Sequence, residues 1–249
     1  MGRKRIRSRS ISCNMPQKEK IQQMFDDIAP SYDAFNHLTS MGIDKSWRRK
    51  ALSLAKGPSV LDVACGTGDF AIAAAKAKPE WNVTGIDLSA GMLEVMARKV
   101  EAEGLGNRVR SVQGDCTASA FADSTFDSVT VAFGVRNFED REKGLREILR
   151  VLKPGGRFVM LELGVPSWQP ARWLYGLYFR HIMPLIGGRM SRNKAAYRYL
   201  PASVLAFPGK KEWLATMERC GFTDCTHRSL TFGICRLYAG ARPRVSQMT

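Results

Sequence analysis

A short apolar run followed by a glycine-rich turn is the feature that most constrains the fold of this chain. Val60–Ala64 is apolar apart from Asp62, and it leads directly into Cys65-Gly66-Thr67-Gly68-Asp69. An alanine-rich helix is predicted next, over Phe70–Lys78. A strand, a glycine turn and a helix in this order are typical of the first unit of a parallel sheet, where glycines let the backbone approach a bound nucleotide or nucleoside.

The alternation of strands and helices continues after this turn. Further strands are predicted at Val83–Ile86, Arg108–Gln113, Phe126–Phe133 and Phe158–Leu163, with helices over Ala90–Glu103 and Arg141–Leu152. Such alternation predicts an α/β fold, a doubly wound and mostly parallel sheet with its ligand at the C-terminal ends of the strands. A helix over Lys211–Cys220 precedes two strands, Phe222–His227 and Thr231–Ala239, whose hairpin would place an antiparallel strand at one end of the sheet.

Two helices are predicted ahead of the sheet. Apolar residues recur at helical spacing between Gln17 and Ala29, and Pro30 is expected to stop that helix. The second helix covers Lys45–Ala55. Another predicted helix, over 169–186, is apolar on most sides, so it is expected to be covered on two sides or to contact lipid.

Acidic residues end three successive predicted strands. Asp62 lies at the end of the first, Asp87 of the second, and Asp115 follows Gly114 after the third. Asp87 can accept from ribose hydroxyls and Asp115 from an adenine amino group, while Asp62 can face the ammonium group of a methionine moiety. These carboxylates would repel a pyrophosphate but suit S-adenosylmethionine, which is cationic and carries no phosphate. We therefore expect S-adenosylmethionine as the cofactor, bound with Gly66 and Gly68, and keep NAD and an acidic rim without ligand as alternatives.

Positive charge is concentrated at two places in a chain whose 38 Lys and Arg outnumber its 23 Asp and Glu. Residues 1–10 are basic and contain no acid, as in a solvated arm, and a short transit peptide is the alternative. Residues 167–211 also lack Asp and Glu, and they are rich in aromatic residues. Aromatic side chains beside cations suit a membrane interface or a nucleic-acid surface, unless the segment is simply a helical subdomain with a basic outer face.

The cysteines and the hydropathy bear on the compartment. Six cysteines are scattered without a secretory signal, which favours reduced thiols in the cytoplasm, and no apolar run is long enough for a membrane-spanning helix. No metal site is expected, because Cys220, Cys225, His227 and Cys235 lack a CxxC knuckle. His37 could be a base near Tyr32 but is interpreted as a packing or capping residue. His181 is interpreted as a core residue, with quinone binding as the alternative.

Five blocks in order resemble one family: FDDIAPSYDAFNHLTSMGIDKSWRRK, VLDVACGTGD, FGVRNF, ILRVLKPGGRF and YRYLPASVLAFP. From about Phe25 to Ala239 the chain is similar to the ubiquinone/menaquinone biosynthesis C-methyltransferases. The resemblance implies a class I S-adenosylmethionine-dependent methyltransferase that methylates a ring carbon of a polyprenylated hydroquinone. It also implies cofactor contacts at Thr67, Asp87 and the pair Asp115-Cys116. Ala132 departs from the family, in which a serine that contacts the cofactor is common.

The substrate that we favour is demethylmenaquinol, with the benzoquinol intermediate of ubiquinone biosynthesis, or both, as the alternative. An RNA methyltransferase and a non-catalytic membrane-surface protein would also fit the basic and aromatic composition. The five family blocks favour the quinol over both, so no nucleic-acid partner is expected.

The chemistry selects candidate catalytic residues. A ring carbon attacks the donor methyl group when its neighbouring hydroxyl is a phenolate, and ionising a phenol of pKa near 10 at neutral pH costs ~4 kcal/mol. Arg136 can stabilise the phenolate, Asn137 can orient the ring or a water, and Tyr32 can close over the site. The alternative for Arg136 is an ion pair with a carboxylate such as Asp33 or Glu162.

The acid-free segment has an expected use above the strand ends. It would take the prenyl tail, with Gly187-Gly188 as a hinge and with Tyr197, Tyr199 and Ser203 lining the ring pocket. Its cations would rest on anionic lipid at the inner face of the membrane, and its apolar helix leaves room for a homodimer. The expected organisation is a basic arm (1–15) and one domain (16–249), divided into N-terminal helices (16–56), a cofactor-binding core (57–166), a helical cover (167–211) and a closing helix and hairpin (212–240).

Overall fold

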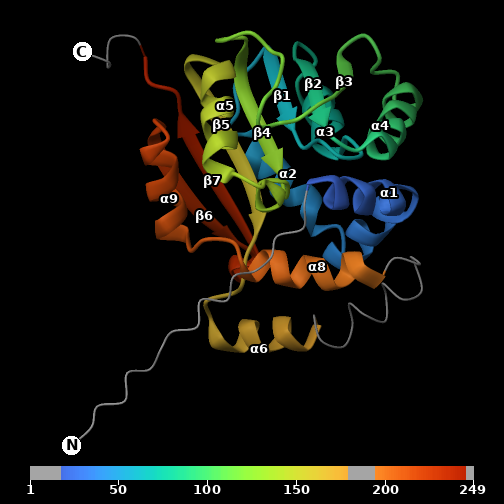
Figure 1. Ribbon diagram of the computed structural model, residues 1–249, viewed down its shortest axis with the longest axis vertical. Coiled ribbons are helices and arrows are strands. Elements are labelled where there is room, and N and C mark those ends of the chain that lie inside the picture. Colours follow the sequence, from blue (N-terminus) through green and yellow to red (C-terminus); the bar gives the residue numbers. More distant parts are fainter. Residues whose placement is uncertain (1–17, 179–193, 245–249) are drawn as a thin grey trace, which may run out of the picture.

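The computed structural model describes residues 18–178 and 194–244, in which a seven-stranded sheet carries helices on both faces (Figure 1). The strand order is β3-β2-β1-β4-β5-β7-β6. The strands are β1 (Ser59–Val63), β2 (Asn82–Asp87), β3 (Val109–Gln113), β4 (Phe126–Ala132), β5 (Leu152–Leu163), β6 (Thr223–Leu230) and β7 (Cys235–Ala241).

The first five strands are parallel, as predicted. Leu61 of β1 is in register with Thr84 of β2 on one side and with Val129 of β4 on the other. The predicted hairpin closes the opposite end of the sheet, where β7 is antiparallel to both β5 and β6. The antiparallel strand thus lies one place in from the edge, and β6 forms the edge itself. The doubly wound α/β fold is confirmed.

The helices are α1 (Lys18–Ser40), α2 (Ile43–Leu52), α3 (Asp69–Ala77), α4 (Ala90–Ala102), α5 (Arg141–Val151), α6 (Gln169–Leu177), α8 (Lys194–Leu205) and α9 (Lys210–Arg219), with short 3-10 turns η1 (Val135–Asn137) and η3 (Thr231–Gly233). Side-chain caps fix two of the helix starts. Ser89 accepts a hydrogen bond from the Met92 amide at α4, and Asp140 accepts one from the Lys143 amide at α5.

Alternating strand residues build two cores, one on each face of the sheet. On β5, Phe158 and Met160 pack into the core beneath α5 and α9, while Val159 and Leu161 pack into the core beneath α2, α3 and α4. Trp213 of α9 is among the largest side chains without solvent exposure. This rigid double layer holds the strand ends, from which the site is built.

The expectation that Pro30 stops the first helix is wrong, since α1 continues through it to Ser40. A proline within a helix removes one backbone hydrogen bond and crowds the preceding turn. Tertiary packing outweighs this cost, because Ala29 and Phe35 on either side of the proline are buried. The longer α1 carries Tyr32 and Asn36 over the ends of the strands.

Other predictions lie partly or wholly outside the described residues. These are the basic arm, the second half of the predicted helix 169–186, His181, the Gly187-Gly188 hinge and the Tyr197 side chain. Within the described part of the chain, no helix has the length and apolarity needed to cross a membrane.

Candidate active site

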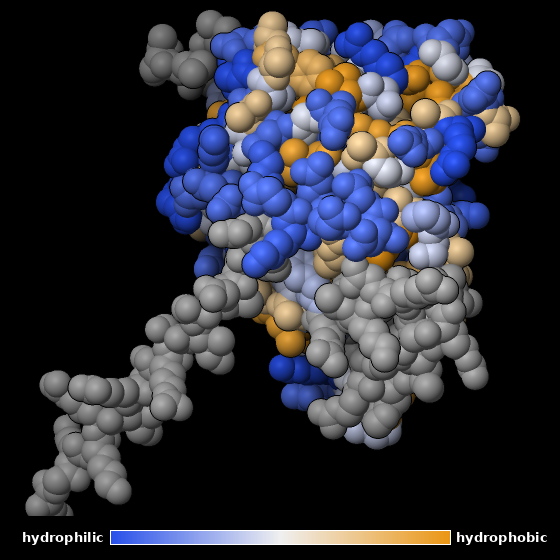
Figure 2. All heavy atoms as spheres, turned by 45° about the vertical axis from the view of Figure 1, so that its right-hand side comes forward, coloured by the Kyte–Doolittle hydropathy of each residue, from blue (hydrophilic) through white to orange (hydrophobic). Residues whose placement is uncertain are grey.

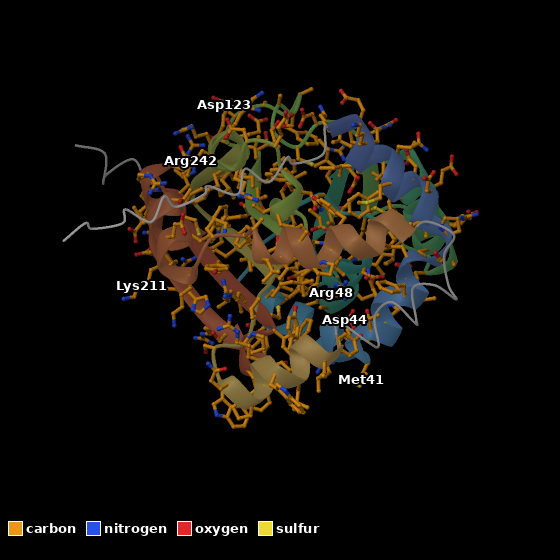
Figure 3. The ribbon with its side chains drawn as sticks, turned by 60° about the horizontal axis from the view of Figure 1, so that its bottom comes forward. Met41, Asp44, Arg48, Asp123, Lys211 and Arg242 are labelled. Carbon is orange, nitrogen blue, oxygen red and sulfur yellow. The ribbon has the colours of Figure 1, made fainter. Side chains whose placement is uncertain are left out.

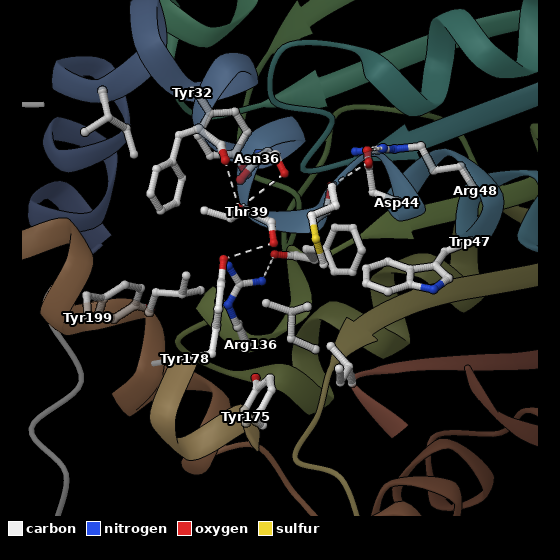
Figure 4. Close-up of a pocket in the computed structure, with 18 of the residues that line it drawn as sticks. Tyr32, Asn36, Thr39, Asp44, Trp47, Arg48, Arg136, Tyr175, Tyr178 and Tyr199 are labelled. Carbon is white, nitrogen blue, oxygen red and sulfur yellow. Dashed lines mark hydrogen bonds and ion pairs between the residues drawn. The ribbon is translucent and has the colours of Figure 1, made fainter. Parts of the chain in front are cut away.

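Two cavities meet at the C-terminal ends of the parallel strands. The strand-end cavity, of about 320 Å³, is bordered by Gly66, Asp87 and Asp115, and the apolar cavity, of about 370 Å³, lies between α1 and α6 (Figure 4). Phe25, Tyr32 and Phe133 line both cavities. The two cavities are therefore adjacent and share part of their walls.

The glycine turn forms one wall of the strand-end cavity. Gly66 has a φ of +54° and open space where a β-carbon would lie, so its backbone faces the cavity directly. Gly68 has a φ of +80°, and a β-carbon there would lie 2.5 Å from Met96 Cγ on α4. Gly68 does not line either cavity: it allows close packing of α4 against the turn.

Asp87 holds the turn in place at the end of β2. Its carboxylate accepts hydrogen bonds from the Gly66 amide at 2.8 Å and the Ser89 amide at 3.0 Å. Burial raises the pKa of Asp87, although these amide hydrogen bonds oppose the effect. Asp87 therefore both shapes the cavity and presents an acceptor at its wall.

Asp115 lies at the end of β3, as the sequence predicts, and is already paired. Lys18 Nζ of α1 is 2.6 Å from its Oδ2, and Thr117 donates to Oδ1 from both its amide and its hydroxyl. Burial acts to raise the pKa of Asp115, but the hydrogen bonds from Lys18 and Thr117 outweigh it and lower that pKa. The neighbouring Cys116 also lines the cavity, and burial raises the pKa of its thiol.

Two predicted cofactor residues lie behind the cavity wall. Asp62 is buried within β1, where Thr130 donates to its Oδ1 at 2.8 Å, and its Oδ2 has no partner among the described residues. Burial raises the pKa of Asp62 to about 7. Thr67 is also buried, and it donates to Asp33 of α1 at 2.5 Å. Neither side chain lines the strand-end cavity, and both support the turn, so direct contact with the cofactor stays a prediction for both.

Arg136 lies in η1 and borders the apolar cavity with its guanidinium paired. Nη1 is 3.1 Å from Oε1 of Glu162, which is fully buried, and it also donates to the Phe133 carbonyl. The Arg136 amide donates to the same carboxylate at 3.1 Å. The ion pair that the sequence offered as the alternative role of Arg136 is thus observed, with Glu162 as the partner. Asp33 instead pairs with Lys99 at 2.6 Å.

Tyr32 lies where the two cavities meet. Burial raises the pKa of its hydroxyl, although the charge of Arg136 and a hydrogen bond with the Asn36 side chain oppose the effect. The hydroxyl is therefore protonated at neutral pH and can donate a hydrogen bond. Asn36, the hydrogen-bond partner of the Tyr32 side chain, also lines the apolar cavity.

Asn137 and Tyr199 connect the two cavities. Tyr199, on α8, lines the apolar cavity and donates to Asn137 Oδ1 at 2.9 Å, while Asn137 lines the strand-end cavity. Ser203 is one turn further along α8, where it donates to the Leu200 carbonyl and lines neither cavity. A role of Ser203 in the ring pocket stays a prediction from the sequence.

Sequence reasoning missed a second buried ion pair at the apolar cavity. Asp44 and Arg48, one turn apart on α2, form an ion pair, and Ser40 donates to Asp44 at 2.7 Å. Burial acts to raise the pKa of Asp44, but the Ser40 hydrogen bond and the Arg48 charge outweigh it and lower that pKa. Met41, Asp44 and Arg48 lie beside one another when the molecule is seen from below (Figure 3). The predicted second helix began at Lys45 and so left out Asp44, whereas α2 begins at Ile43 and places Asp44 four residues before Arg48 on the same helix.

One group of described residues brings a histidine and two carboxylates together: His37, Asp44 and Asp69. Both carboxylates already have cationic partners, since Arg48 pairs with both and Lys99 lies 2.5 Å from Asp69. The group is a network of ion pairs that joins α1, α2, α3 and α4. His37 lines neither cavity.

The sheet order, the glycine turn and the acidic strand ends together define a class I methyltransferase fold with a nucleoside-binding cavity. The chain belongs to the ubiE/COQ5 methyltransferase family, whose model matches residues 14–242. The resemblance predicted from five sequence blocks is confirmed, and so is S-adenosylmethionine as the methyl donor.

Several relatives match over most of their length. The chain is 45% identical to a Bacteroides fragilis protein named demethylmenaquinone methyltransferase, over 91% of this chain and 94% of that one. It is 46% identical to a Geotalea daltonii protein named ubiquinone/menaquinone biosynthesis C-methyltransferase UbiE, over 90% of this chain and 97% of that one. A Thermus thermophilus demethylmenaquinone methyltransferase is 46% identical, over 88% of this chain and 100% of its own.

Solved structures share the fold at low identity. The crystal structure of the [4+2]-cyclase SpnF has a TM-score of 0.65 and 18% identity, over 92% of this chain and 97% of that one. Phosphoethanolamine N-methyltransferase 2 of Haemonchus contortus, in complex with S-adenosyl-L-methionine, has a TM-score of 0.60 and 18% identity, over 88% of this chain and 60% of that one. These similarities support the fold alone.

The strand-end cavity fits a cationic donor. Four acidic residues and two lysines line its wall. The acidic residues are Asp87, Asp115, Glu139 and Asp140, and the lysines are Lys18 and Lys143. The open space at Gly66 leaves room for a nucleoside against the backbone. A net negative wall suits the sulfonium and ammonium groups of S-adenosylmethionine.

Proposed function

We propose that this methyltransferase methylates a ring carbon of a polyprenylated hydroquinone, converting demethylmenaquinol to menaquinol. The observation that carries the proposal is the junction of the two cavities at Tyr32 and Phe133. One cavity has acidic strand ends that suit the donor, and the other is apolar with a buried arginine at its wall, which suits a ring with a prenyl tail. The names of the relatives from Bacteroides fragilis and Thermus thermophilus support the same substrate.

On the donor side, we assign orientation to the turn and to two strand ends. S-adenosylmethionine supplies the methyl group when bound. Asp87 accepts from ribose hydroxyls, Asp115 accepts from the adenine amino group, and Gly66 lets the nucleoside lie against the backbone. Asp62 and Thr67 support these positions from behind, and Cys116 packs beside Asp115.

On the acceptor side, we assign the stabilisation of the phenolate to Arg136. Glu162 offsets part of its charge, so Arg136 acts as a directed hydrogen-bond donor more than as a free cation. The protonated Tyr32 hydroxyl donates to the ring oxygen, and Asn137, held by Tyr199, orients the ring. The phenolic proton leaves to solvent through water, since Tyr32 is a poor base. The methylated ring carbon then loses its own hydrogen as a proton to water, which restores the aromatic ring, and the ring oxygen regains a proton to give the quinol.

The site of action that we propose is the inner face of a membrane, because a polyprenylated substrate resides in lipid. The acid-free segment between 167 and 211 supports this placement through its cations and aromatic residues. A homodimer stays a prediction from the sequence.

The test is mass spectrometry of the product. Purified protein is incubated in detergent with S-adenosylmethionine and chemically reduced demethylmenaquinone, and in parallel with a reduced demethylated ubiquinone precursor. A gain of one methyl group on the naphthoquinol is expected. A gain on both would support the second candidate, an enzyme of both pathways, which the name of the Geotalea daltonii relative favours. Intact cofactor binding with no gain on either would contradict the proposal and favour the RNA alternative.

A further inference from the structure

Large apolar side chains lie in solvent around the opening of the apolar cavity. Met41, at the junction of α1 and α2, is 79% exposed, and Phe232, in η3, is 68% exposed. Leu174 of α6 is exposed as well, and all three also line the cavity. The opening is therefore bordered by apolar groups from three segments that are far apart in the sequence.

The backbone at two of these positions is strained. Met41 has a φ of 51° and Phe232 a φ of 57°, in the left-handed region that glycine adopts at lower cost. At both turns the chain instead carries a bulky apolar residue and directs it outward. Strain of this kind persists where the surrounding structure enforces it, and it is most frequent at functional sites.

Helix α6 extends the same apolar surface. None of its residues is buried, and Trp168, Trp173 and Leu177 are exposed. The Trp168 ring lies against the Phe232 ring, with 5.7 Å between their centroids. We define the apolar rim as these exposed side chains together: Met41, Trp168, Trp173, Leu174, Leu177 and Phe232.

Exposed cations accompany the apolar rim. Arg172 lies between the two tryptophans on α6, and Lys45 and Arg49 follow Met41 on α2. No Asp or Glu occurs between 167 and 211. The face over α1 differs, since hydrophilic side chains predominate across its middle (Figure 2). Tryptophans beside cations match the interfacial region of an anionic bilayer, where the rings lie at headgroup depth and the cations contact lipid phosphates.

We propose that the apolar rim inserts into an anionic lipid surface, so that the cavity opens into the bilayer and the prenylated ring enters it without crossing water. This inference rests on the proposed function for the identity of the substrate. The binding surface itself is defined by the exposed residues alone. Because the cavity is continuous with the apolar rim, the prenyl tail stays in lipid while the ring reaches Arg136.

The tryptophans provide a direct readout of insertion. Trp81 and Trp213 are buried away from the apolar cavity, and Trp47 is buried at its wall, so Trp168 and Trp173 are the two tryptophans exposed to a quencher in lipid outside the cavity. The full chain is mixed with phosphatidylcholine vesicles with and without phosphatidylglycerol, and lipids brominated in the acyl chain are used as the quencher. We expect partial quenching on the anionic vesicles and little on neutral ones.

A double variant, Trp168→Ser with Trp173→Ser, tests the energetics by vesicle flotation. Neither tryptophan lines a cavity, so methyl transfer in detergent should stay within about twofold of wild type. Partitioning to anionic vesicles should fall about tenfold. The matched control is Val112→Ser, an exposed apolar position on β3 at the other end of the molecule from α6 (Figure 1), which should not change partitioning.

The outcomes separate this inference from the proposed function. Methyl transfer in detergent with unquenched tryptophans, or with full vesicle binding by the double variant, would overturn the lipid surface and leave the proposed function standing. Vesicle binding that depends on the apolar rim, without methyl transfer to any quinol, would support the lipid surface and overturn the proposed function. A dimer in solution that the double variant dissociates would assign the apolar rim to a second copy of the chain instead.

Discussion

The Tyr199 hydroxyl donates a hydrogen bond of 2.9 Å to Asn137 Oδ1, and this contact joins a wall of the apolar cavity to a wall of the strand-end cavity. Tyr199 belongs to α8 and Asn137 to η1, so the bond also fixes the helix against the strand ends. A ring that binds beside Tyr199 is thereby placed relative to the donor methyl group.

Removing this hydrogen bond should affect turnover more than folding. Tyr199→Phe keeps the ring and deletes the donor, and a neutral hydrogen bond contributes about 0.5–1.5 kcal/mol. We expect kcat to fall about threefold to tenfold, with cofactor affinity unchanged, measured by quinol methylation and by titration of the cofactor. Tyr178→Phe is the control, because its hydroxyl donates to the Thr39 carbonyl away from Asn137. Equal effects of the two variants would contradict a positioning role for Tyr199.

Arg136 and Asp87 should separate acceptor chemistry from donor binding. Arg136→Lys keeps a cation beside the buried Glu162 and loses the directed guanidinium, so turnover should fall about 100-fold with little change in cofactor affinity. Asp87→Asn should weaken cofactor binding about tenfold or more, because a charged acceptor is lost. Equilibrium binding and single-turnover rates measure the two effects.

Arg136→Ala is a poor choice for the same test, because it leaves Glu162 buried without a cation and costs about 3–5 kcal/mol of stability. Arg136→Met combined with Glu162→Gln removes both charges together and should fold. If Arg136→Lys weakened cofactor binding as much as Asp87→Asn does, the assignment of Arg136 to the acceptor would fail.

Asp62 should make stability depend on pH. Its pKa is raised by burial from 3.8 to about 7, so the folded state binds the proton more tightly than the unfolded state. The stability contributed by the protonated carboxyl is complete below about pH 4 and is lost as the pH rises through 7. Asp62→Asn removes this dependence. The free energy of unfolding of the variant, relative to that of wild type, should therefore increase by up to about 4 kcal/mol between pH 4 and pH 8.5.

Urea unfolding of both proteins at several pH values measures the effect. Asparagine can still accept from Thr130, so the comparison isolates the charge. A parallel pH dependence of the two proteins would show that Asp62 is ionised and accommodated in the folded chain. A marked loss of cofactor affinity in Asp62→Asn would support the direct contact predicted from sequence.

Lys18 competes for the acceptor that the proposed function assigns to the adenine amino group. Lys18→Met frees Asp115 Oδ2, and an exposed ion pair contributes at most about 1 kcal/mol. Cofactor affinity should therefore rise up to about fivefold, and it should fall more steeply with added salt, because the cavity wall becomes more negative. The control is Lys20→Met, an exposed lysine two residues further along α1 that has no ion pair among the described residues. Lower affinity in Lys18→Met alone would mean that Lys18 helps to bind the donor.

Local sequence patterns were sufficient to predict most of the sheet. The apolar run before Gly66, the acidic strand ends and the closing hairpin were all predicted within a few residues of their observed positions, because strand and turn signals are local. Pro30 was misinterpreted for the same reason. The local cost of a proline was visible in the sequence, whereas the burial of Ala29 and Phe35 that offsets it was not.

The sequence by itself determined the α/β class and the family, since these depend on short motifs in a specific order. Only the tertiary structure decided that Asp62 and Thr67 lie behind the cavity, that Arg136 is paired with Glu162, and that two cavities meet at Tyr32. The physical reason is that burial and pairing depend on residues distant in the chain. Glu162 on β5 and Arg136 in η1 meet because neighbouring parallel strands end at the same edge of the sheet.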